Sequence, residues 1–138
     1  FSKCFGAPFM PRLASVYAKM LGEKISKHNT SVYLINTGWS GGPYSVGERI
    51  KIEYSRAMVT AAITGSLDIV KFSHNDIFNL DIPTECPGVP SEILEPRNTW
   101  IDKDSYDLSA KKLSQMFVDN FKKFENISDE IRSAGPKI

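Results

Sequence analysis

A short apolar run that leads straight into a glycine-rich loop constrains the fold of this chain most. The run, Ser31–Ile35, is short, nearly continuous in its apolarity and contains β-branched residues. That pattern is typical of a strand buried inside an α/β sheet. The loop that follows, Asn36–Gly47, holds four of the nine glycines. Because ligands of α/β folds bind beyond the carboxyl ends of strands, we expect any site to lie at this loop.

Helical periodicity marks the segments around this strand and loop. Apolar residues recur at helical spacing in Leu13–Lys27 and in Asp104–Phe124, and a final turn is expected over Ser128–Ala134. A further helix is predicted over Ser55–Thr64, with Ser55 as a candidate N-cap, and it ends at Gly65, where a left-handed cap favours glycine.

Shorter extended segments complete the expected α/β pattern. Arg49–Ile52 alternates polar and apolar residues like a short strand. Val70 and Phe72 indicate another strand, as do the apolar residues between Ile77 and Ile82. Four of the eight prolines follow before Trp100, which predicts an irregular wrapping segment.

Composition excludes several classes of protein. The 138 residues suffice for one domain, and a net charge of +1 argues against a polybasic nucleic-acid binder. Two cysteines and two histidines make a disulfide scaffold or a dedicated zinc site improbable. The longest nearly apolar stretch, Ala57–Ile63, is far shorter than the roughly 20 residues that cross a bilayer. Because the chain opens on Phe1 and not on methionine, we expect a piece of a longer protein.

The glycine-rich loop comes close to a phosphate-binding loop without being one. Gly42–Arg49 has the glycine spacing of G-x-x-x-x-G-K-[ST], but Glu48 stands in the place of the lysine and Arg49 in the place of the hydroxyl residue. An arginine here is still able to stack on a base or bind phosphate oxygens, and Ser55 either bonds a base edge or caps its helix. On the pattern alone, the purely structural roles are favoured.

Five separated motifs carry a resemblance that spacing alone does not. The motifs are Cys4–Phe9, Asn36–Gly42, Gly47–Ile52, Pro96–Trp100 and Ala134–Pro136. In this order they resemble the C-terminal portion of the ATP-dependent phosphoenolpyruvate carboxykinase family. The resemblance implies an α/β fold with a mixed sheet and flanking helices. All of residues 1–138 would then be the C-terminal part of a mononucleotide-binding domain whose phosphate loop lies upstream of this chain.

The resemblance also implies an activity. The family converts oxaloacetate and ATP into phosphoenolpyruvate, carbon dioxide and ADP, the step that opens gluconeogenesis, with Mg²⁺ and Mn²⁺ as cofactors. It implies a cytoplasmic enzyme with ATP and oxaloacetate as its small-molecule partners and no nucleic-acid or membrane partner. Catalytic and metal-binding residues are expected upstream, so the isolated 138 residues are not expected to be active.

Three residues of this chain match the nucleotide-binding positions of the family. They are Arg49, Ile50 against the adenine, and Ser55, where the family often has threonine. One departure is Arg12–Ser15, where the family usually reads Leu-His-Pro-Thr. Two alternatives stay open, a stand-alone nucleotide-binding module and a structural wrap without catalysis. Self-association is one way for such a piece to cover its exposed apolar faces.

Overall fold

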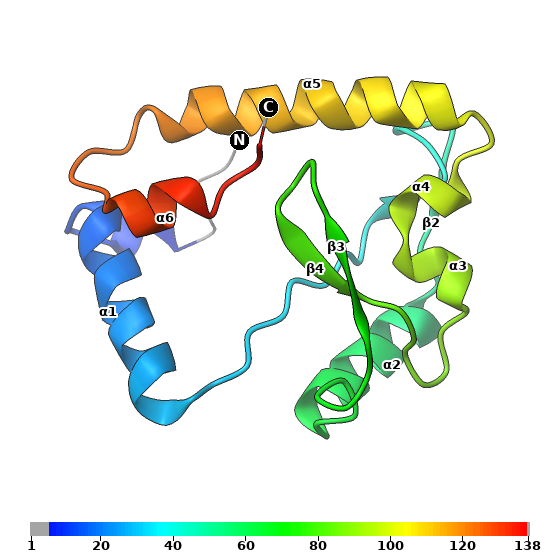
Figure 1. Cartoon of the computed structure of the whole chain (residues 1–138), viewed down its shortest axis with the longest axis horizontal. Coiled ribbons are helices and arrows are strands. Elements are labelled where there is room, and N and C mark those ends of the chain that lie inside the picture. Colours follow the sequence, from blue (N-terminus) through cyan, green and yellow to red (C-terminus); the bar gives the residue numbers. More distant parts are fainter. Residues whose placement is uncertain (1–5, 138) are drawn as a thin grey trace.

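The computed structural model describes residues 6–137, so the motif residues Cys4 and Phe5 lie outside the described part. A long helix, α5 (Lys103–Phe121), runs along one side of the molecule, with the other elements arranged below it (Figure 1). Near one end of α5 lie η1 (Ala7–Phe9), α1 (Ala14–His28) and α6 (Asp129–Ser133). Toward its other end lie α2 (Ile52–Ile63), α3 (Ser91–Leu94) and α4 (Pro96–Thr99).

The strands form two small antiparallel sheets. In the first, β1 (Trp39–Ser40) pairs with β2 (Glu48–Arg49). In the second, β3 (Phe72–Asn75) pairs with β4 (Leu80–Pro83), and the cross-strand partners of this pair include His74 and Asp81, whose Nδ1 and Oδ1 atoms are 2.8 Å apart. Helices combined with small sheets are consistent with the predicted α/β class.

For the part of the chain that the structure describes, the predictions of a mixed sheet and of a strand at Ser31–Ile35 are wrong. Residues 30–37 belong to neither a helix nor a strand. The main chain of residues 31–35 makes no hydrogen bond to any residue between 6 and 137. A strand exists only with a partner, and the apolar pattern of this segment does not supply one.

Most helices lie where the apolar periodicity predicts them, but α2 begins before its predicted start. The structure starts α2 at Ile52 with Lys51 as its N-cap, so the predicted N-cap role of Ser55 is wrong and Ser55 is the fourth helical residue. Gly65 is confirmed as the left-handed end of α2, with φ of 74° and a 3.0 Å bond from the Ser66 N–H to the Ala61 carbonyl. At the unusual start of α1, the Arg12 N–H donates to the Tyr17 hydroxyl at 3.4 Å.

The buried core lies between α2 and the proline-rich segment. Its buried members are Ala61, Leu67, Cys86 and Val89, and burial raises the pKa of the Cys86 thiol. That shift fits a structural cysteine. The α5 helix buries a second set of side chains, Tyr106, Ala110 and Ser114. Between residues 6 and 137, the structure contains no helix with the length and apolarity to cross a membrane.

Candidate functional site

The glycine-rich loop folds into a β-hairpin. The Pro43 carbonyl accepts hydrogen bonds from the N–H groups of Val46 (3.0 Å) and Gly47 (2.9 Å), which closes the turn. A Cβ on Gly47 would lie only 2.5 Å from the Ser40 carbonyl oxygen and 2.6 Å from that of Gly42, so this position requires glycine. The loop returns on the strand before it and does not open a helix as a phosphate-binding loop does.

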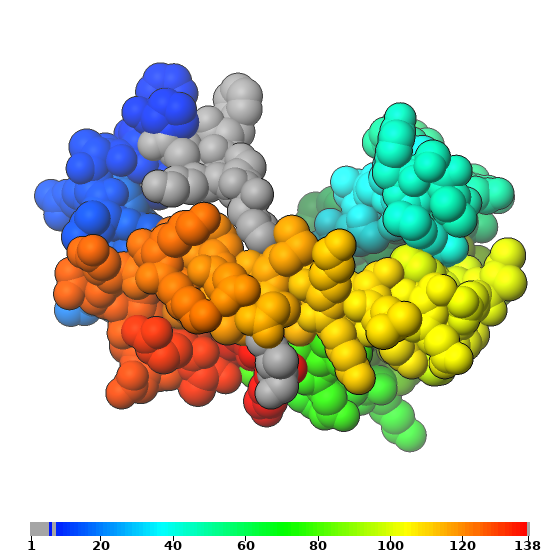
Figure 2. Space-filling model, turned by 90° about the horizontal axis from the view of Figure 1, so that it is seen from above, coloured from blue at the N-terminus to red at the C-terminus, as the bar shows by residue number. Residues whose placement is uncertain are grey.

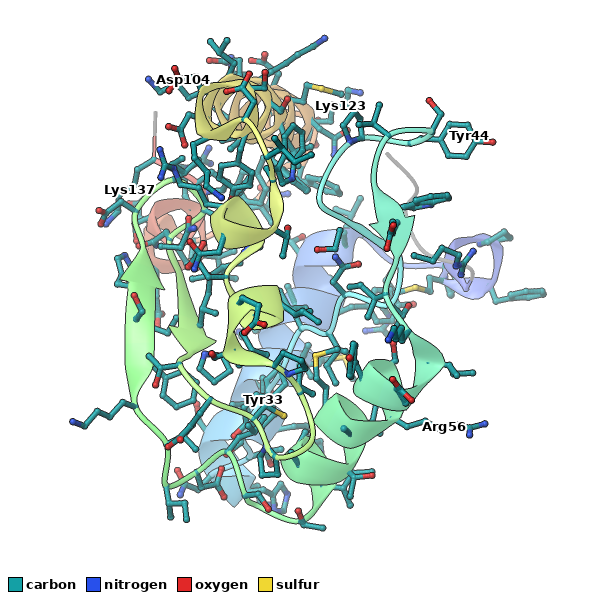
Figure 3. The ribbon with its side chains drawn as sticks, turned by 90° about the vertical axis from the view of Figure 1, so that its right-hand side faces the viewer. Tyr33, Tyr44, Arg56, Asp104, Lys123 and Lys137 are labelled. Carbon is teal, nitrogen blue, oxygen red and sulfur yellow. The ribbon has the colours of Figure 1, made fainter. Side chains whose placement is uncertain are left out.

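The two faces of the hairpin carry different residues. Strand side chains alternate between faces, and cross-strand partners share a face. Trp39 pairs with Arg49 and Ser40 pairs with Glu48, so Arg49 shares a face with Trp39, opposite to the face of Ser40. The Tyr44 ring packs edge-on against Trp39 at 5.4 Å, and Tyr44 points away from the body of the molecule (Figure 3).

The three predicted nucleotide-binding residues lie on one continuous strand-to-helix turn. Arg49 ends β2 and is exposed, whereas Ile50 and Ser55 are half-buried. The Ile50 N–H donates to the Gly38 carbonyl at 2.9 Å, which holds the turn against the hairpin. Among residues 6–137, neither the Arg49 guanidinium nor the Ser55 hydroxyl has a hydrogen-bond or ion-pair partner.

A threonine distant in sequence holds the hairpin in place. The Thr99 hydroxyl oxygen accepts from the Ser40 hydroxyl at 3.0 Å and from the Gly41 N–H at 3.0 Å. The same hydroxyl donates to the Pro96 carbonyl at 2.8 Å, inside α4. We call Ser40, Gly41 and Thr99 the hairpin anchor. Sequence reasoning missed it, although Thr99 lies within one of the motifs that carried the resemblance.

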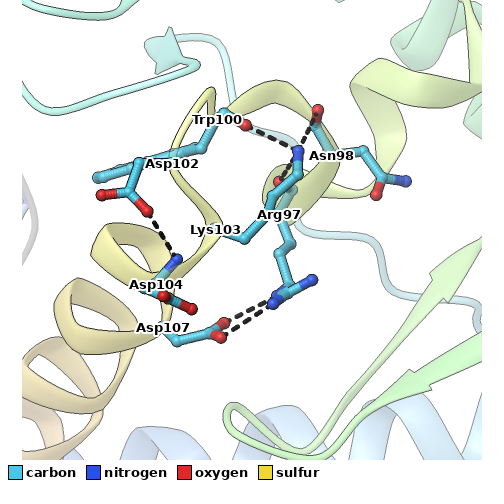
Figure 4. Close-up of polar contacts among 7 residues, drawn as sticks. All are labelled: Arg97, Asn98, Trp100, Asp102, Lys103, Asp104 and Asp107. Atoms are coloured by element: carbon cyan, nitrogen blue, oxygen red, sulfur yellow. Dashed lines mark hydrogen bonds and ion pairs between the residues drawn. The ribbon is translucent and has the colours of Figure 1, made fainter.

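Charged side chains join α4 to the long helix α5 (Figure 4). The Lys103 ammonium donates to the carbonyl oxygens of Arg97 (2.9 Å), Asn98 (2.9 Å) and Trp100 (2.7 Å). The Arg97 guanidinium binds both carboxylate oxygens of Asp107, at 2.9 and 3.0 Å. These hydrogen bonds lower the pKa of Asp107. The α4 helix that carries Thr99 is thus fixed to α5 by two independent sets of contacts.

The lowered pKa of Asp107 predicts how the contact between α4 and α5 depends on pH. A carboxyl group whose pKa is lowered by folding stabilises the protein above its ordinary value of 3.8, and the stabilisation is lost as the pH falls through the lowered value. We expect Asp107→Asn to lower the melting temperature at pH 7 and to lower it less at a pH below 3.8, where the stabilisation by the carboxylate is being lost. Thermal unfolding of the complete protein at both pH values measures this. An equal loss at both would contradict an ionic role for Asp107.

The three predicted nucleotide-binding residues lie outside the hollow beside α2. A hollow of about 490 Å³ lies between residues 31–35 and α2, and its lining includes Tyr33, Ile35 and Asp68 but none of the three predicted residues. Between residues 6 and 137, no three His, Cys, Asp or Glu side chains are grouped closely enough to hold a metal ion. No group of side chains in the described part of the chain is thus assigned to the Mg²⁺ and Mn²⁺ that the resemblance implies.

Comparisons with known proteins show which family of enzymes this chain is similar to. A family model described as phosphoenolpyruvate carboxykinase matches residues 1–92. The chain is 63% identical over 137 residues to "Phosphoenolpyruvate carboxykinase (ATP)" of Caldanaerobacter subterraneus, covering 99% of this chain and 26% of that protein. Enzymes with the same name are 60% identical in Fusobacterium nucleatum and 56% in Alkaliphilus oremlandii, covering 99% and 100% of this chain and 26% of each.

The chain therefore belongs to the phosphoenolpyruvate carboxykinase family. It spans about a quarter of the length of the curated relatives that it matches. The fold and the hairpin described above correspond to that quarter of the relatives.

Proposed function

We propose that this chain supplies the adenine-binding wall of the ATP site in an ATP-dependent phosphoenolpyruvate carboxykinase. The observation that carries the proposal is Arg49, which is exposed and has no partner among residues 6–137 although it lies on an anchored hairpin. A long cationic side chain at the end of a fixed strand is suited to bind a ligand that the remaining protein also contacts.

Each of the three residues supplies a different interaction in this proposal. The planar guanidinium of Arg49 stacks on the base or binds a phosphate oxygen. The half-buried Ile50 offers apolar surface to the flat face of the adenine. The unpartnered hydroxyl of Ser55 bonds a polar edge of the nucleotide. Phosphoryl transfer and decarboxylation of oxaloacetate, the metal ions, and the place of the reaction in cytoplasmic gluconeogenesis belong to the proposed whole enzyme.

The unpaired segment 31–35 supports a place inside a larger nucleotide-binding domain. Tyr33 and Ile35 line the hollow against α2, whereas Val32 and Leu34 are 63% and 82% exposed on the other side. A strand-like segment with apolar residues on both faces is typical of the interior of an α/β sheet. We propose that the remainder of the enzyme pairs with this segment, and that a second copy does so only when the chain is isolated.

The Ser55 hydroxyl gives the direct test of the proposed function. In the complete enzyme, we expect Ser55→Ala to raise the KM for ATP about fivefold, because one net hydrogen bond is lost, and to leave the KM for oxaloacetate unchanged. Steady-state kinetics with each substrate varied in turn measures both values. Ser55→Thr is the matched control, because it keeps the hydroxyl and should stay within about twofold of the parent enzyme. Equal effects of both variants would contradict a role for the hydroxyl.

A further inference from the structure

The hairpin depends on Thr99 for its attachment to the rest of the molecule. Within residues 6–137, every hydrogen bond from residues 38–50 to a segment distant in sequence ends on the Thr99 hydroxyl. The two strands of the hairpin are only two residues long each. Because an isolated two-stranded hairpin is marginal in water, its orientation depends on what it is attached to.

The anchor lies next to the proposed nucleotide-binding face without being part of it. Ser40, which bonds Thr99, follows Trp39 directly, and Trp39 is the cross-strand partner of Arg49. The anchored side chain and Arg49 lie on opposite faces of the hairpin, because strand side chains alternate. Thr99 therefore contacts one face of the hairpin, and the Arg49 side chain lies on the opposite face.

The close approach at Gly41 shows how tightly the hairpin and α4 fit together. Gly41 has a φ of 78°, and a Cβ at this position would lie 3.2 Å from the Thr99 carbonyl oxygen. The hairpin backbone thus contacts both the hydroxyl and the carbonyl side of Thr99. In the space-filling view, the hairpin forms a projecting lobe next to the segment that contains α4 and the start of α5 (Figure 2).

We propose that Thr99 is a positioning residue for ATP, which sets the place of Arg49 through the hairpin and does not itself touch the nucleotide. This inference rests on the proposed function of Arg49. It also gives the proline-rich segment a defined task, because Lys103 and the Arg97–Asp107 pair fix Thr99 relative to α5. In this proposal, the contacts that hold α4 against α5 also help to position the residue that binds the nucleotide.

The first experiment removes the Thr99 hydroxyl while keeping the shape of the side chain. In the complete enzyme, Thr99→Val should raise the KM for ATP about tenfold, because two donors lose their shared acceptor. The KM for oxaloacetate should stay within about twofold. Thr99→Ser restores the hydroxyl and should return the KM for ATP to within about threefold of the parent value. Failure of this rescue, or equal losses for both substrates, would overturn the inference.

A matched control removes a threonine hydroxyl elsewhere. The Thr84 hydroxyl donates to the Lys71 carbonyl at 3.1 Å beside the β3–β4 hairpin. Thr84→Val loses one main-chain contact by the same chemical change, but it lies outside the hairpin anchor. It should leave the KM for ATP unchanged. If Thr84→Val raised this KM as much as Thr99→Val does, the effect would be general destabilisation and the inference would fail.

A double-mutant cycle shows whether Thr99 acts through Arg49. If it does, Thr99→Val added to Arg49→Ala should change the KM for ATP less than twofold, because the group that it positions is already gone. Additive losses would overturn the inference and leave the proposed function intact. An Arg49→Ala variant with an unchanged KM for ATP would instead contradict the proposed function, whatever Thr99→Val does.

Discussion

Replacing Arg49 by alanine in the complete enzyme is expected to raise the KM for ATP by roughly 10–150-fold. The guanidinium has no partner among residues 6–137, so in the proposed function none of these residues competes with the nucleotide for its hydrogen-bonding groups. Hydrogen bonds to a charged group contribute about 1.5–3 kcal/mol, more than neutral ones, and this range sets the expected loss. Initial-rate kinetics with ATP varied at saturating oxaloacetate measures the change, and the KM for oxaloacetate should stay within about twofold.

Arg56 provides the control for loss of charge. It lies on α2, seven residues after Arg49, and its side chain points outward into solvent (Figure 3). Arg56→Ala changes the net charge by the same amount as Arg49→Ala and should leave both KM values unchanged. Arg49→Lys separates charge from shape, because lysine keeps the charge but lacks the planar fork. Equal losses of ATP and oxaloacetate affinity in Arg49→Ala would contradict the assignment of Arg49 to the nucleotide.

The helices could be predicted from the sequence because their signals are local. Apolar spacing placed α1 and α5 to within a few residues, and Gly65 marked the end of α2 because its left-handed conformation, with φ of 74°, favours glycine. The start of α2 was missed for an equally local reason. Its N-cap is Lys51, whose side chain makes no cap hydrogen bond, so the sequence contains no capping signal there.

The pairing of strands could not be predicted, because it depends on segments far apart in the chain. Residues 31–35 have the composition of a buried strand, yet no segment between residues 6 and 137 pairs with them. The apolar pattern is typical of a buried strand, but it does not identify the segment that would pair with it. By contrast, the β3–β4 hairpin could be anticipated, because its two strands are neighbours in sequence.

The candidate site was predicted in part. The resemblance supplied Arg49, Ile50 and Ser55, and the structure places them on one turn, although their contact with a nucleotide stays a prediction. The hairpin anchor could not be found by spacing, because its hydrogen bonds join residues 58 and 59 positions apart. Thr99 lies in one of the motifs that carried the resemblance, but that motif gives no role to its hydroxyl, which is seen only in the fold.

The second large effect is expected at Gly47, where the hairpin closes on itself. A Cβ at this position would meet three main-chain atoms, the nearest at 2.5 Å, and main chain moves aside less readily than the end of a side chain. We expect Gly47→Ala to cost about 3 kcal/mol locally, which the short strands of the hairpin cannot absorb. The hairpin should open and displace Arg49, raising the KM for ATP about 100-fold. Because the damage is local, the melting temperature of the complete enzyme should change little.

Gly22 offers the matched control for a glycine-to-alanine change. It lies within α1, and a Cβ there would meet no atom within 4 Å. Gly22→Ala should therefore stabilise the helix by about 0.5–1 kcal/mol, since alanine restricts the unfolded chain more than glycine does, and it should leave the KM for ATP unchanged. If Gly47→Ala also left this KM unchanged, then Arg49 would not depend on the hairpin. The contrast between the two variants thus tests whether ATP binding depends on the closed turn at Gly47.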